Sequence, residues 1–563
     1  MAFLDWIVIG VFCFALIGIV LWVVSQKNNN SADYFLGGKD ATWIAIGASI
    51  FASNIGSEHL IGLAGAGASS GMAMAHWEIQ GWMILILGWV FVPFYTRSMV
   101  YTMPEFLEKR YNKESRTILS VISLISYVLT KVAVTVYAGG LVFQQVFGIK
   151  ELWGIDFFWI AAIGLVVITA LYTIFGGMKS VLYTSVLQTP ILLLGSLIIL
   201  VLGLKELGGW DEMMSICGAE TVNEYSNTMT ELIRNNNDPN FPWLGALVGS
   251  AIIGFWYWCT DQFIVQRVLS GKDEKEARRG TIFGAYLKLL PVFLFLIPGM
   301  IAFALHQKYV GVGAEGFLPL LNGNPNADAA FPTLVAKLLP AGVKGLVVCG
   351  ILAALMSSLA SLFNSSAMLF TIDFYKRFKP ETPEKTLVVL GQIATVVIVI
   401  LGILWIPIMR SVGDVLYTYL QDVQSVLAPG IAAAFLLGIT WKRTSAKGGM
   451  WGLIAGMVIG LTRLGAKVYY SNVECAADSM FKYLFYDLNW LFFCGWMFLF
   501  CIVVVIIVSM FTEAPSEDKI KGLVFGTSTP EQIAATRASW NKWDVIHSVI
   551  ILGITVAFYV YFW

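Results

Sequence analysis

Charged residues are scarce in this chain of 563 residues. Asp, Glu, Lys and Arg together make up 13% of it, whereas hydrophobic residues make up 58%. This balance excludes an ordinary soluble domain. The 36 basic residues are matched by 36 acidic ones, so no excess of positive charge points to a nucleic-acid partner. A mean hydropathy of +0.75 predicts a protein that crosses a membrane many times.

Cysteine is also scarce, with seven residues spread along the chain. No two of them have the spacing of a metal site, and no nucleophile–base pair is recognisable, so we do not expect an enzyme. Cys217 and Cys475 lie in two predicted outer loops, and a disulfide between them stays open because sequence fixes no geometry. The others fall in apolar segments and are typical packing residues: Cys13, Cys259, Cys349, Cys494 and Cys501.

The N-terminus lacks the features of a cleaved signal peptide. The first apolar stretch begins at Phe3, contains Asp5 and follows no basic residue. It also lacks a small-x-small cleavage site, so we expect it to be retained as a helix.

Long apolar segments fill the rest of the sequence. We count fourteen, and several are longer than the roughly 20 residues that a helix needs to cross a bilayer. They predict an all-α polytopic membrane protein with about 14 transmembrane helices, some of them tilted or kinked. The segments are 4–25, 41–67, 76–97, 117–146, 156–176, 184–203, 242–266, 279–305, 341–372, 384–408, 415–439, 447–466, 488–511 and 543–562.

Lysine and arginine concentrate in every second loop. By the positive-inside rule, five such loops belong in the cytoplasm: 26–40, 98–116, 267–278, 373–383 and 440–447. With fourteen spans, both termini then lie outside. The outer loop 204–241 is the largest on its side. Its turn-rich run from Asn235 to Trp243 indicates a plain solvated loop rather than a lid.

Spans two to six and seven to eleven form two sets of five. Because five is odd, the second set enters the membrane from the opposite side, which suits an inverted repeat with a site at the interface. Topology alone supports this repeat. The predicted domains are an N-terminal extra helix (1–40), the first repeat (41–203), an extracytoplasmic loop (204–241), the second repeat (242–440) and C-terminal extra helices (441–563).

One apolar span is interrupted. Ser49 to Gly67 reads SIFASNIGSEHLIGLAGAG, in which four glycines and several polar residues break the helical pattern. A membrane tolerates freed backbone groups only where they face protein or a watery cavity. Such a span is therefore a pointer to a transporter site, where free carbonyls can bind a small cation. The alternative is a kinked helix whose small residues only allow close packing.

Serines recur in the ninth span, which reads ALMSSLASLFNSS from Ala354 onward. Sodium is a hard cation that prefers oxygen ligands, and Ala354 shares a helix face with Ser357 and Ser358. Taken alone, the pattern is more typical of a helix–helix contact. Combined with the broken segment at 52–56, it favours an ion site.

A few polar side chains lie inside apolar spans, where such groups line a cavity or form pairs: His59, Glu78, Lys288 and Gln421. A salt bridge between Glu78 and Lys288 is the structural alternative. Together the four suit a polyol, whose hydroxyls both donate and accept hydrogen bonds. The rings of Trp256, Tyr257 and Trp258 can stack on the C–H face of a sugar, or they only pack.

Long motifs in this chain resemble the solute:sodium symporter family, most of all its sodium–glucose cotransporter branch. They are GASIFASNIGSEHLIGLAGAGA, WYWCTDQFIVQR, ALMSSLASLFNSSAMLFTIDFY and FLLGITWKR. The resemblance runs from DYFLGGK at Asp33 to the last helix. It implies a LeuT-like core of two inverted five-helix repeats. It also implies that sodium flow drives solute uptake by alternating access.

The resemblance also implies two sets of site residues. Sodium would bind the carbonyls of Ala52, Ile55 and Ala354 and the hydroxyls of Ser357 and Ser358. The sugar would accept or donate hydrogen bonds at Asn54, His59, Glu78, Lys288 and Gln421. Trp258 would contact the sugar, and Tyr257 would lie beside it as part of an inner gate.

One position departs from the family. Relatives often carry an aspartate where this chain has Ser185, and that aspartate is associated with a second sodium site or the ion exit path. Serine cannot supply the same charge, so we favour one sodium per solute. His59 resembles the vertebrate glucose carriers, whereas some bacterial relatives have glutamine there.

These observations predict a sodium-coupled symporter of the inner membrane that imports a hexose such as glucose or galactose. A second hypothesis keeps the fold and changes the solute to myo-inositol, sialic acid or another polyol. A third, a membrane sensor, would need a soluble signalling domain. We do not expect one, because the final helix runs to the end at Trp563.

Overall fold

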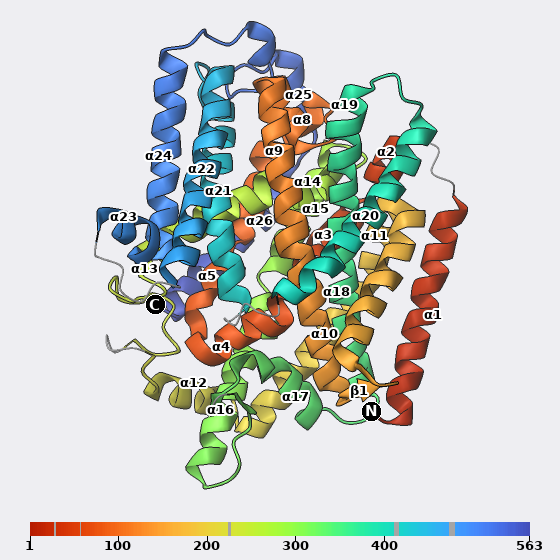
Figure 1. The fold of residues 1–563 in the computed structure, drawn as a ribbon, viewed down its shortest axis with the longest axis vertical. Helices are drawn as coiled ribbons and strands as arrows, with labels where there is room; N and C mark the ends of the chain where they lie inside the picture. The colour runs from red at the N-terminus through yellow and green to blue at the C-terminus, as the bar shows by residue number, and fades with distance from the viewer. Residues whose placement is uncertain (27–29, 57, 223–226, 322, 410–415, 472–478) are drawn as a thin grey trace.

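The computed structural model describes residues 1–26, 30–56, 58–222, 227–321, 323–409, 416–471 and 479–563. Nearly all of these residues are helical (Figure 1), because a helix satisfies its own backbone groups where no water is available. Two short antiparallel hairpins complete the described part: β1 (Glu151–Leu152) pairs with β2 (Ile155–Asp156), and β3 (Leu320–Leu321) pairs with β4 (Asn324–Pro325).

Helices occupy every predicted span. The first half contains α1 (Phe3–Ser25), α3 (Trp43–Asn54), α4 (Ala64–Ser70), α5 (Ala75–Glu78), α6 (Gly81–Ile86), α7 (Val92–Ser98), α9 (Lys113–Ser126), α10 (Ala133–Phe147) and α11 (Phe157–Leu207). The second half contains α13 (Trp243–Gly254), α14 (Gln262–Leu269), α15 (Glu274–Lys288), α16 (Ile297–Gly311), α18 (Val343–Met368), α20 (Glu384–Met409), α21 (Leu416–Thr440), α22 (Ala446–Ser471), α24 (Trp490–Met510) and α26 (Lys542–Tyr561). Within the described residues, 11 helical segments are long and apolar enough to cross a membrane.

Wide π-helical turns interrupt several spans and join their halves: η2 (Glu58–Leu63), η4 (Leu87–Phe91), η5 (Tyr127–Val132), η6 (Phe255–Thr260), η7 (Val292–Leu296) and η9 (Leu369–Tyr375). Such turns are frequent at functional sites. The fifth and sixth predicted spans both form helix, as the two halves of α11, which meet at a single non-helical residue. This residue is Gly177 (φ 55°), where any Cβ would collide with the carbonyl oxygen of Tyr34.

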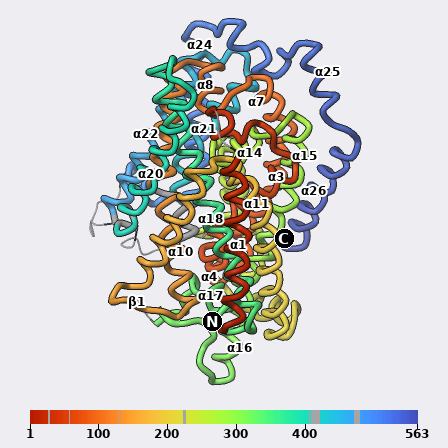
Figure 2. Tube along the Cα trace, turned by 90° about the vertical axis from the view of Figure 1, so that its right-hand side faces the viewer, coloured from red at the N-terminus to blue at the C-terminus, as the bar shows by residue number. Residues whose placement is uncertain are grey.

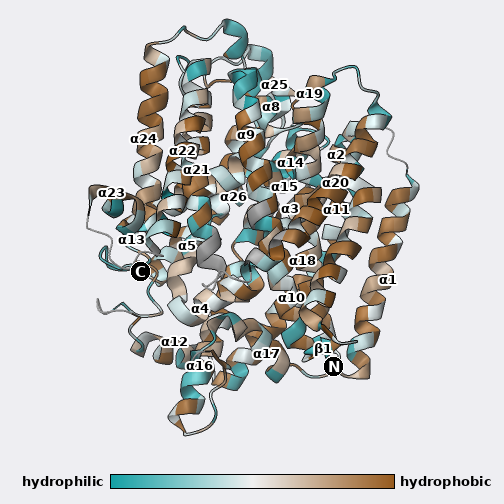
Figure 3. Ribbon diagram, in the orientation of Figure 1, coloured by the Kyte–Doolittle hydropathy of each residue, from teal (hydrophilic) through white to brown (hydrophobic). Residues whose placement is uncertain are grey.

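The basic loops gather at one end of the molecule. The short helices α2 (Ser31–Leu36), α8 (Met103–Arg110), α19 (Lys376–Phe378) and α25 (Pro530–Ala538) lie toward the top of Figure 1. The N-terminus, β1, α12 (Trp210–Ala219) and α17 (Ala330–Leu338) lie at the bottom, as the turned view of Figure 2 also shows. Figure 3 shows apolar residues on the outer helices α1, α20 and α24, with hydrophilic residues around α8 and α25. This arrangement agrees with the predicted orientation.

The helix α18 lies at the centre of the bundle. In its most apolar window 89% of the residues are buried inside the protein, compared with 17% for the peripheral helix α1. It packs against α11, α1, α20 and α3, and α3 packs in turn against α15. The predicted serine-rich span therefore runs beside the predicted broken span.

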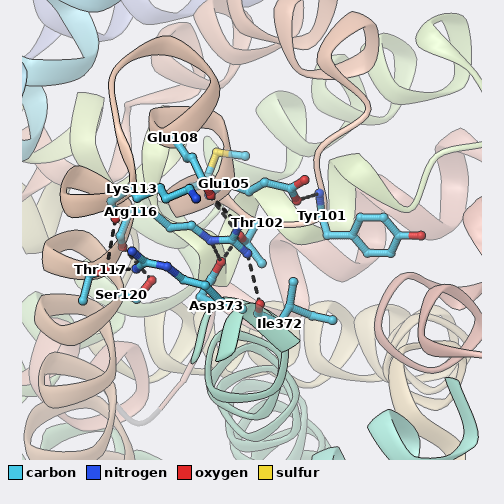
Figure 4. Close-up of polar contacts among 12 residues, drawn as sticks. Tyr101, Thr102, Glu105, Glu108, Lys113, Arg116, Thr117, Ser120, Ile372 and Asp373 are labelled. Atoms are coloured by element: carbon cyan, nitrogen blue, oxygen red, sulfur yellow. Dashed lines mark hydrogen bonds and ion pairs between the residues drawn. The ribbon is translucent and has the colours of Figure 1, made fainter. Parts of the chain in front are cut away.

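A polar network fastens the helix ends on the basic side (Figure 4). The Arg116 guanidinium lies 2.7 Å from Asp373 Oδ1 and 2.6 Å from Glu108 Oε2. Thr102 Oγ1 donates to the same Asp373 oxygen at 2.8 Å. These contacts hold α8 and the start of α9 against η9. They bury the Asp373 side chain with the countercharge that a buried carboxylate requires.

Several described residues of the outer loop 204–241 pack against the helices, which corrects our interpretation of the loop as plainly solvated. The Met72 N–H donates to the Met229 carbonyl at 2.8 Å, and the Leu232 N–H donates to the Phe562 carbonyl at 2.9 Å. Phe241 is 3% exposed and its ring packs edge-on against Trp77. The sequence did not indicate this packing, because turn-forming residues and buried apolar residues alternate in the loop. The loop covers the outer ends of α4 and α5.

Cys217 is buried in α12, where its Sγ lies 3.8 Å from the Met300 carbonyl oxygen. Cys475 lies outside the described residues. The disulfide that the sequence left open is therefore untested.

Candidate functional site

The helix α3 ends where the sequence predicted a break. Its final helical hydrogen bond runs from the Ile55 N–H to the Phe51 carbonyl at 2.9 Å, and Ile55 itself is extended (ψ 103°). Because α3 has 12 residues, it is about 18 Å long, so the break lies near the middle of a bilayer core about 30 Å thick. A helix end leaves its last carbonyls without helical partners. The carbonyls from Ala52 onward are such groups.

Serines of α18 face this break. Ser361 Oγ lies 2.6 Å from Ser53 Oγ, and a Cβ placed on Gly56 would lie 3.1 Å from Ser358 Oγ. Ser357 Oγ lies 3.2 Å from Ser185 Oγ of α11. The helix α18 thus brings its hydroxyls to the end of α3, and α11 adds the hydroxyl of Ser185 beside Ser357.

The structure therefore brings the predicted sodium ligands to one region. Ala52 and Ile55 flank the end of α3, and Ser357 and Ser358 approach it from α18. Ala354 precedes these serines by one helical turn and is 1% exposed. Their role as sodium ligands stays a prediction.

All seven predicted solute residues line one cavity beside the break: Asn54, His59, Glu78, Tyr257, Trp258, Lys288 and Gln421. They come from α3, η2, α5, η6, α15 and α21. The cavity has a volume of about 40 Å³, room for a few water molecules but not for a sugar ring. Its walls must therefore move apart before a solute of that size can enter.

A buried network of charges and amides connects the cavity walls. Lys288 Nζ lies 2.6 Å from Glu78 Oε2 and donates to Asn54 Oδ1 at 3.2 Å. His59 Nε2 lies 3.3 Å from the same Glu78 oxygen, and Asn54 Nδ2 donates to Tyr257 OH at 3.1 Å. The salt bridge that we kept as the structural alternative is thus present, and it forms part of the cavity wall. Pairing of this kind reduces the cost of burying charges in the membrane.

The indole of Trp258 has a fixed position in the wall. Its Nε1 donates to Gln80 Oε1 at 3.2 Å, and Gln80 Nε2 donates to the Ser250 carbonyl at 2.8 Å. Lys288 Nζ lies 5.3 Å from the Trp258 ring, within the range of a cation–π contact. Of the three aromatic residues singled out in this segment, Trp256 does not line the cavity, so the packing alternative holds for Trp256.

Several cavity residues were missed by the sequence analysis: Glu58, Trp77, Gln80, Ile253, Gly254 and Gln424. Glu58 lies within the broken segment, so its position was a usable signal. Gln424 lies one helical turn after Gln421, on the same helix face.

A second buried ion pair lies next to the cavity. Lys131 Nζ of η5 lies 2.7 Å from Asp261 Oδ2, just beyond η6, and Tyr127 OH donates to the other Asp261 oxygen. The same ammonium lies 4.7 Å from the centre of the Tyr257 ring. Because Tyr257 is also bonded to Asn54, contacts connect these residues to the cavity wall, and we call this group the floor of the cavity.

A helix broken at mid-membrane beside a nearly closed polar cavity, in a bundle of membrane-crossing helices, is the arrangement of a secondary transporter. The model of the sodium:solute symporter family matches residues 34–456. The chain therefore belongs to the sodium:solute symporter family.

Relatives extend along most of the chain. Sodium/myo-inositol cotransporter 2 of Homo sapiens is 37% identical over 538 residues, which cover 93% of this chain and 79% of that protein. Sodium/myo-inositol cotransporter of Homo sapiens is 36% identical over 537 residues, covering 91% and 74%. A solved structure of a Na⁺-coupled sialic acid symporter in a substrate-bound outward-open state aligns with a TM-score of 0.73 at 21% identity, covering 92% of this chain and 99% of that one.

These comparisons confirm the family, the sodium coupling and the fold class. The protein is an all-α, multi-pass membrane protein with a LeuT-like core, and sodium is its coupling ion. The family is one of sodium-coupled transporters rather than enzymes. The exact number of membrane-crossing helices, about 14 by sequence, and the five domain boundaries stay predictions.

Proposed function

We propose that this protein, a sodium-coupled symporter, carries a neutral polyol such as myo-inositol into the cell across the inner membrane. The relatives named sodium/myo-inositol cotransporter support this solute. It was the alternative in the sequence analysis, and it is favoured here over the hexose that the sequence analysis named first.

The cavity carries this proposal, because its polar groups match a polyol. The Lys288 ammonium donates hydrogen bonds, the Glu78 carboxylate accepts them, and the amides of Gln421 and Gln424 do both. Each hydroxyl of a polyol also does both. Two carboxylates, Glu58 and Glu78, line the cavity with one lysine, a balance that disfavours an anionic solute such as sialic acid.

In our proposal, sodium binds at the end of α3 to the carbonyls of Ala52 and Ile55. The Ala354 carbonyl and the hydroxyls of Ser357 and Ser358 complete an all-oxygen shell, which is the ligand set that a hard cation prefers. Ser185 adds a hydroxyl 3.2 Å from Ser357 Oγ and no charge, which supports one sodium per solute.

Coupling follows from the position of Asn54, which lies between Ala52 and Ile55 in the chain. Its amide group touches both Lys288 and Tyr257, so ordering of the break by sodium also orders the solute site. The solute must then raise sodium affinity by the factor with which sodium raises solute affinity. For typical allosteric coupling this factor is about 5 to 150.

Alternating access requires the floor of the cavity to open. The Lys131–Asp261 pair, the Tyr127 hydroxyl and the Tyr257 ring would have to separate before solute and sodium leave the cavity. A buried ion pair that loses one partner is strongly destabilised, so water must reach both groups as they part. The floor would therefore open only together with a water-filled exit.

Uptake into proteoliposomes tests the proposal. An inward sodium gradient should drive accumulation of labelled myo-inositol, and replacement of sodium by potassium should abolish it. Unlabelled glucose, galactose and sialic acid serve as competitors at matched concentration. Strong competition by glucose with weak uptake of myo-inositol would restore the hexose assignment. Equal uptake of myo-inositol in potassium would refute the proposal.

A further inference from the structure

A basic pocket lies at the cytoplasmic end of the molecule, apart from the transport site. It has a volume of about 340 Å³, and its lining includes Arg97, Lys109, Lys519 and Lys521, with Asp518 as the one carboxylate among the lining residues that the structure describes. Arg97 lies in the last turn of α7 and Lys109 belongs to α8, whereas Lys519 and Lys521 belong to the segment between α24 and α26. Two parts of the chain more than four hundred residues apart thus contribute positive charge to one hollow.

The four cations form no ion pair with a carboxylate within the part of the chain that the structure describes. The Arg97 guanidinium donates to Ser528 Oγ at 2.7 Å and to Thr536 Oγ1 at 2.5 Å. Lys109 Nζ donates to the Ser98 carbonyl, and Lys519 Nζ donates to the Glu108 carbonyl at 2.7 Å. Arginine has five N–H donors and lysine three, so each of these side chains keeps donors for a further acceptor.

Glu108, the carboxylate that directly precedes Lys109, is already paired. Glu108 lies 2.6 Å from the Arg116 guanidinium, on the network of Figure 4. Burial lowers the pKa of Lys519, and the nearby Arg110 adds to this effect while Glu108 opposes it. Glu274 and Glu531 interact electrostatically with Arg97 and Lys521, respectively, without forming an ion pair with them in the described residues, so the positive charge of the pocket is only partly compensated.

The pocket is held open by packing. Val524 is fully buried, the Phe525 N–H donates to the Ile439 carbonyl at 2.8 Å, and the Phe525 ring meets Phe94 edge-on at 5.2 Å. On the other side, Gln532 of α25 lines the pocket, and its N–H and amide oxygen are fixed by Thr529. A binding site whose walls are already ordered loses little entropy on binding.

We propose that this pocket binds a phosphate group. An arginine fork with three lysines and one opposing carboxylate suits a multiply charged oxyanion better than a single carboxylate. The phosphate would join α7 and α8 to the segment that leads to α26. It belongs either to an anionic phospholipid of the cytoplasmic leaflet or to a free phosphate in the cytosol.

Thermal unfolding of the purified full-length protein in detergent tests the proposal. Phosphate is titrated against chloride at constant sodium and ionic strength, so that neither the coupling ion nor screening changes. The unfolding midpoint should rise with phosphate and saturate. Lys521→Gln should weaken phosphate binding about fivefold, as loss of one charge-assisted contact at an exposed position implies.

Lys521 is the variant of choice because its side chain is exposed and no hydrogen bond within the described residues uses it, so the fold does not depend on it. Lys385→Gln removes an equally exposed charge from the start of α20, and it should bind phosphate like the wild type. Equal weakening by both variants would mean non-specific charge effects and would overturn the proposal.

A second experiment distinguishes a lipid headgroup from free phosphate as the source of the phosphate group. Protein in phosphatidylcholine nanodiscs is compared with protein in nanodiscs that also contain phosphatidylglycerol, followed by native mass spectrometry. If wild type retains phosphatidylglycerol more than Lys521→Gln, and the lipid removes the effect of inorganic phosphate, the ligand is a lipid headgroup. If only inorganic phosphate acts, the ligand is soluble. If neither binds, the pocket is not a phosphate site, and the transport proposal is unaffected.

Discussion

Replacement of Ser358 by alanine removes one hydroxyl from the broken end of α3 and leaves the backbone of α18 unchanged. That hydroxyl faces the break, because a Cβ on Gly56 would lie 3.1 Å from Ser358 Oγ. A contact between a hydroxyl and a charged group contributes about 1.5–3 kcal/mol, and each 1.4 kcal/mol corresponds to a factor of ten in affinity. We therefore expect the sodium concentration for half-maximal uptake to rise roughly ten- to a hundredfold.

The assay is uptake of labelled myo-inositol into proteoliposomes over a range of sodium concentrations, with choline as the balancing cation. At saturating sodium, Ser358→Ala should recover most of the wild-type rate, because only sodium affinity is reduced. Apparent solute affinity should fall at low sodium and return at high sodium, as linkage requires.

Ser361→Ala is the matched control for this experiment. Ser361 lies on the same helix, is buried like Ser358, and contacts Ser53 Oγ at 2.6 Å without belonging to the proposed ligand set. It should change the sodium dependence far less than Ser358→Ala. The reasoning is refuted if the two variants behave alike, or if Ser358→Ala lowers the maximal rate and leaves the sodium dependence unchanged.

Three further variants test other parts of the account. Gly56→Ala adds a Cβ that crowds the Ser358 hydroxyl at 3.1 Å, so sodium affinity in the same titration should fall at least severalfold. Gln421→Ala removes a buried amide from the cavity, so the solute KM should rise roughly tenfold with little change in sodium dependence. Asp261→Asn removes the charge that faces Lys131 at 2.7 Å. The floor should then open more often, and solute efflux from preloaded proteoliposomes should be faster.

Each of these variants has an outcome that counts against it. Unchanged sodium affinity in Gly56→Ala would mean that the ion lies elsewhere. If Gln421→Ala shifts the sodium dependence more than the solute KM, Gln421 belongs to the sodium site rather than to the solute site. Slower efflux in Asp261→Asn would mean that the pair helps to open the floor rather than to close it. Thermal unfolding of every variant separates these effects from loss of folding.

Cys217 offers a test of the packed outer region. Burial raises the pKa of its thiol to about 12, so almost none of it is thiolate near neutral pH, and the thiolate is the reactive form. Alkylation of Cys217 in the native protein should be slow and should accelerate on unfolding. Rapid alkylation of the native protein would show that α12 opens readily.

The site was largely readable from sequence because a membrane restricts what polar and broken segments can do. Glycines and polar residues around Asn54 interrupt an apolar span, and the backbone groups freed there must face protein or a watery cavity. The helix α3 indeed ends at Asn54. Ionisable residues such as Glu78 and Lys288 had to pair or face a cavity, and they do both.

The missed residues have physical reasons. On an ideal helix, Gln80 would face away from Glu78, which is two residues earlier. However, α5 ends at Glu78, and both Ile79 (ψ 27°) and Gln80 (ψ 23°) leave the helical region, so both polar side chains reach the cavity. Lys131 is an ionisable residue inside the predicted span 117–146. Its partner Asp261 is 130 residues away, and no local pattern connects the two.

The central claim is that ion and solute share one broken helix, so their affinities must be coupled. Equilibrium binding of labelled myo-inositol should be measured at low and saturating sodium, and sodium binding at low and saturating myo-inositol, on the same purified protein. The account predicts that both affinities rise by the same factor, about 5 or more. Solute binding that is indifferent to sodium, with sodium binding indifferent to solute, would contradict it.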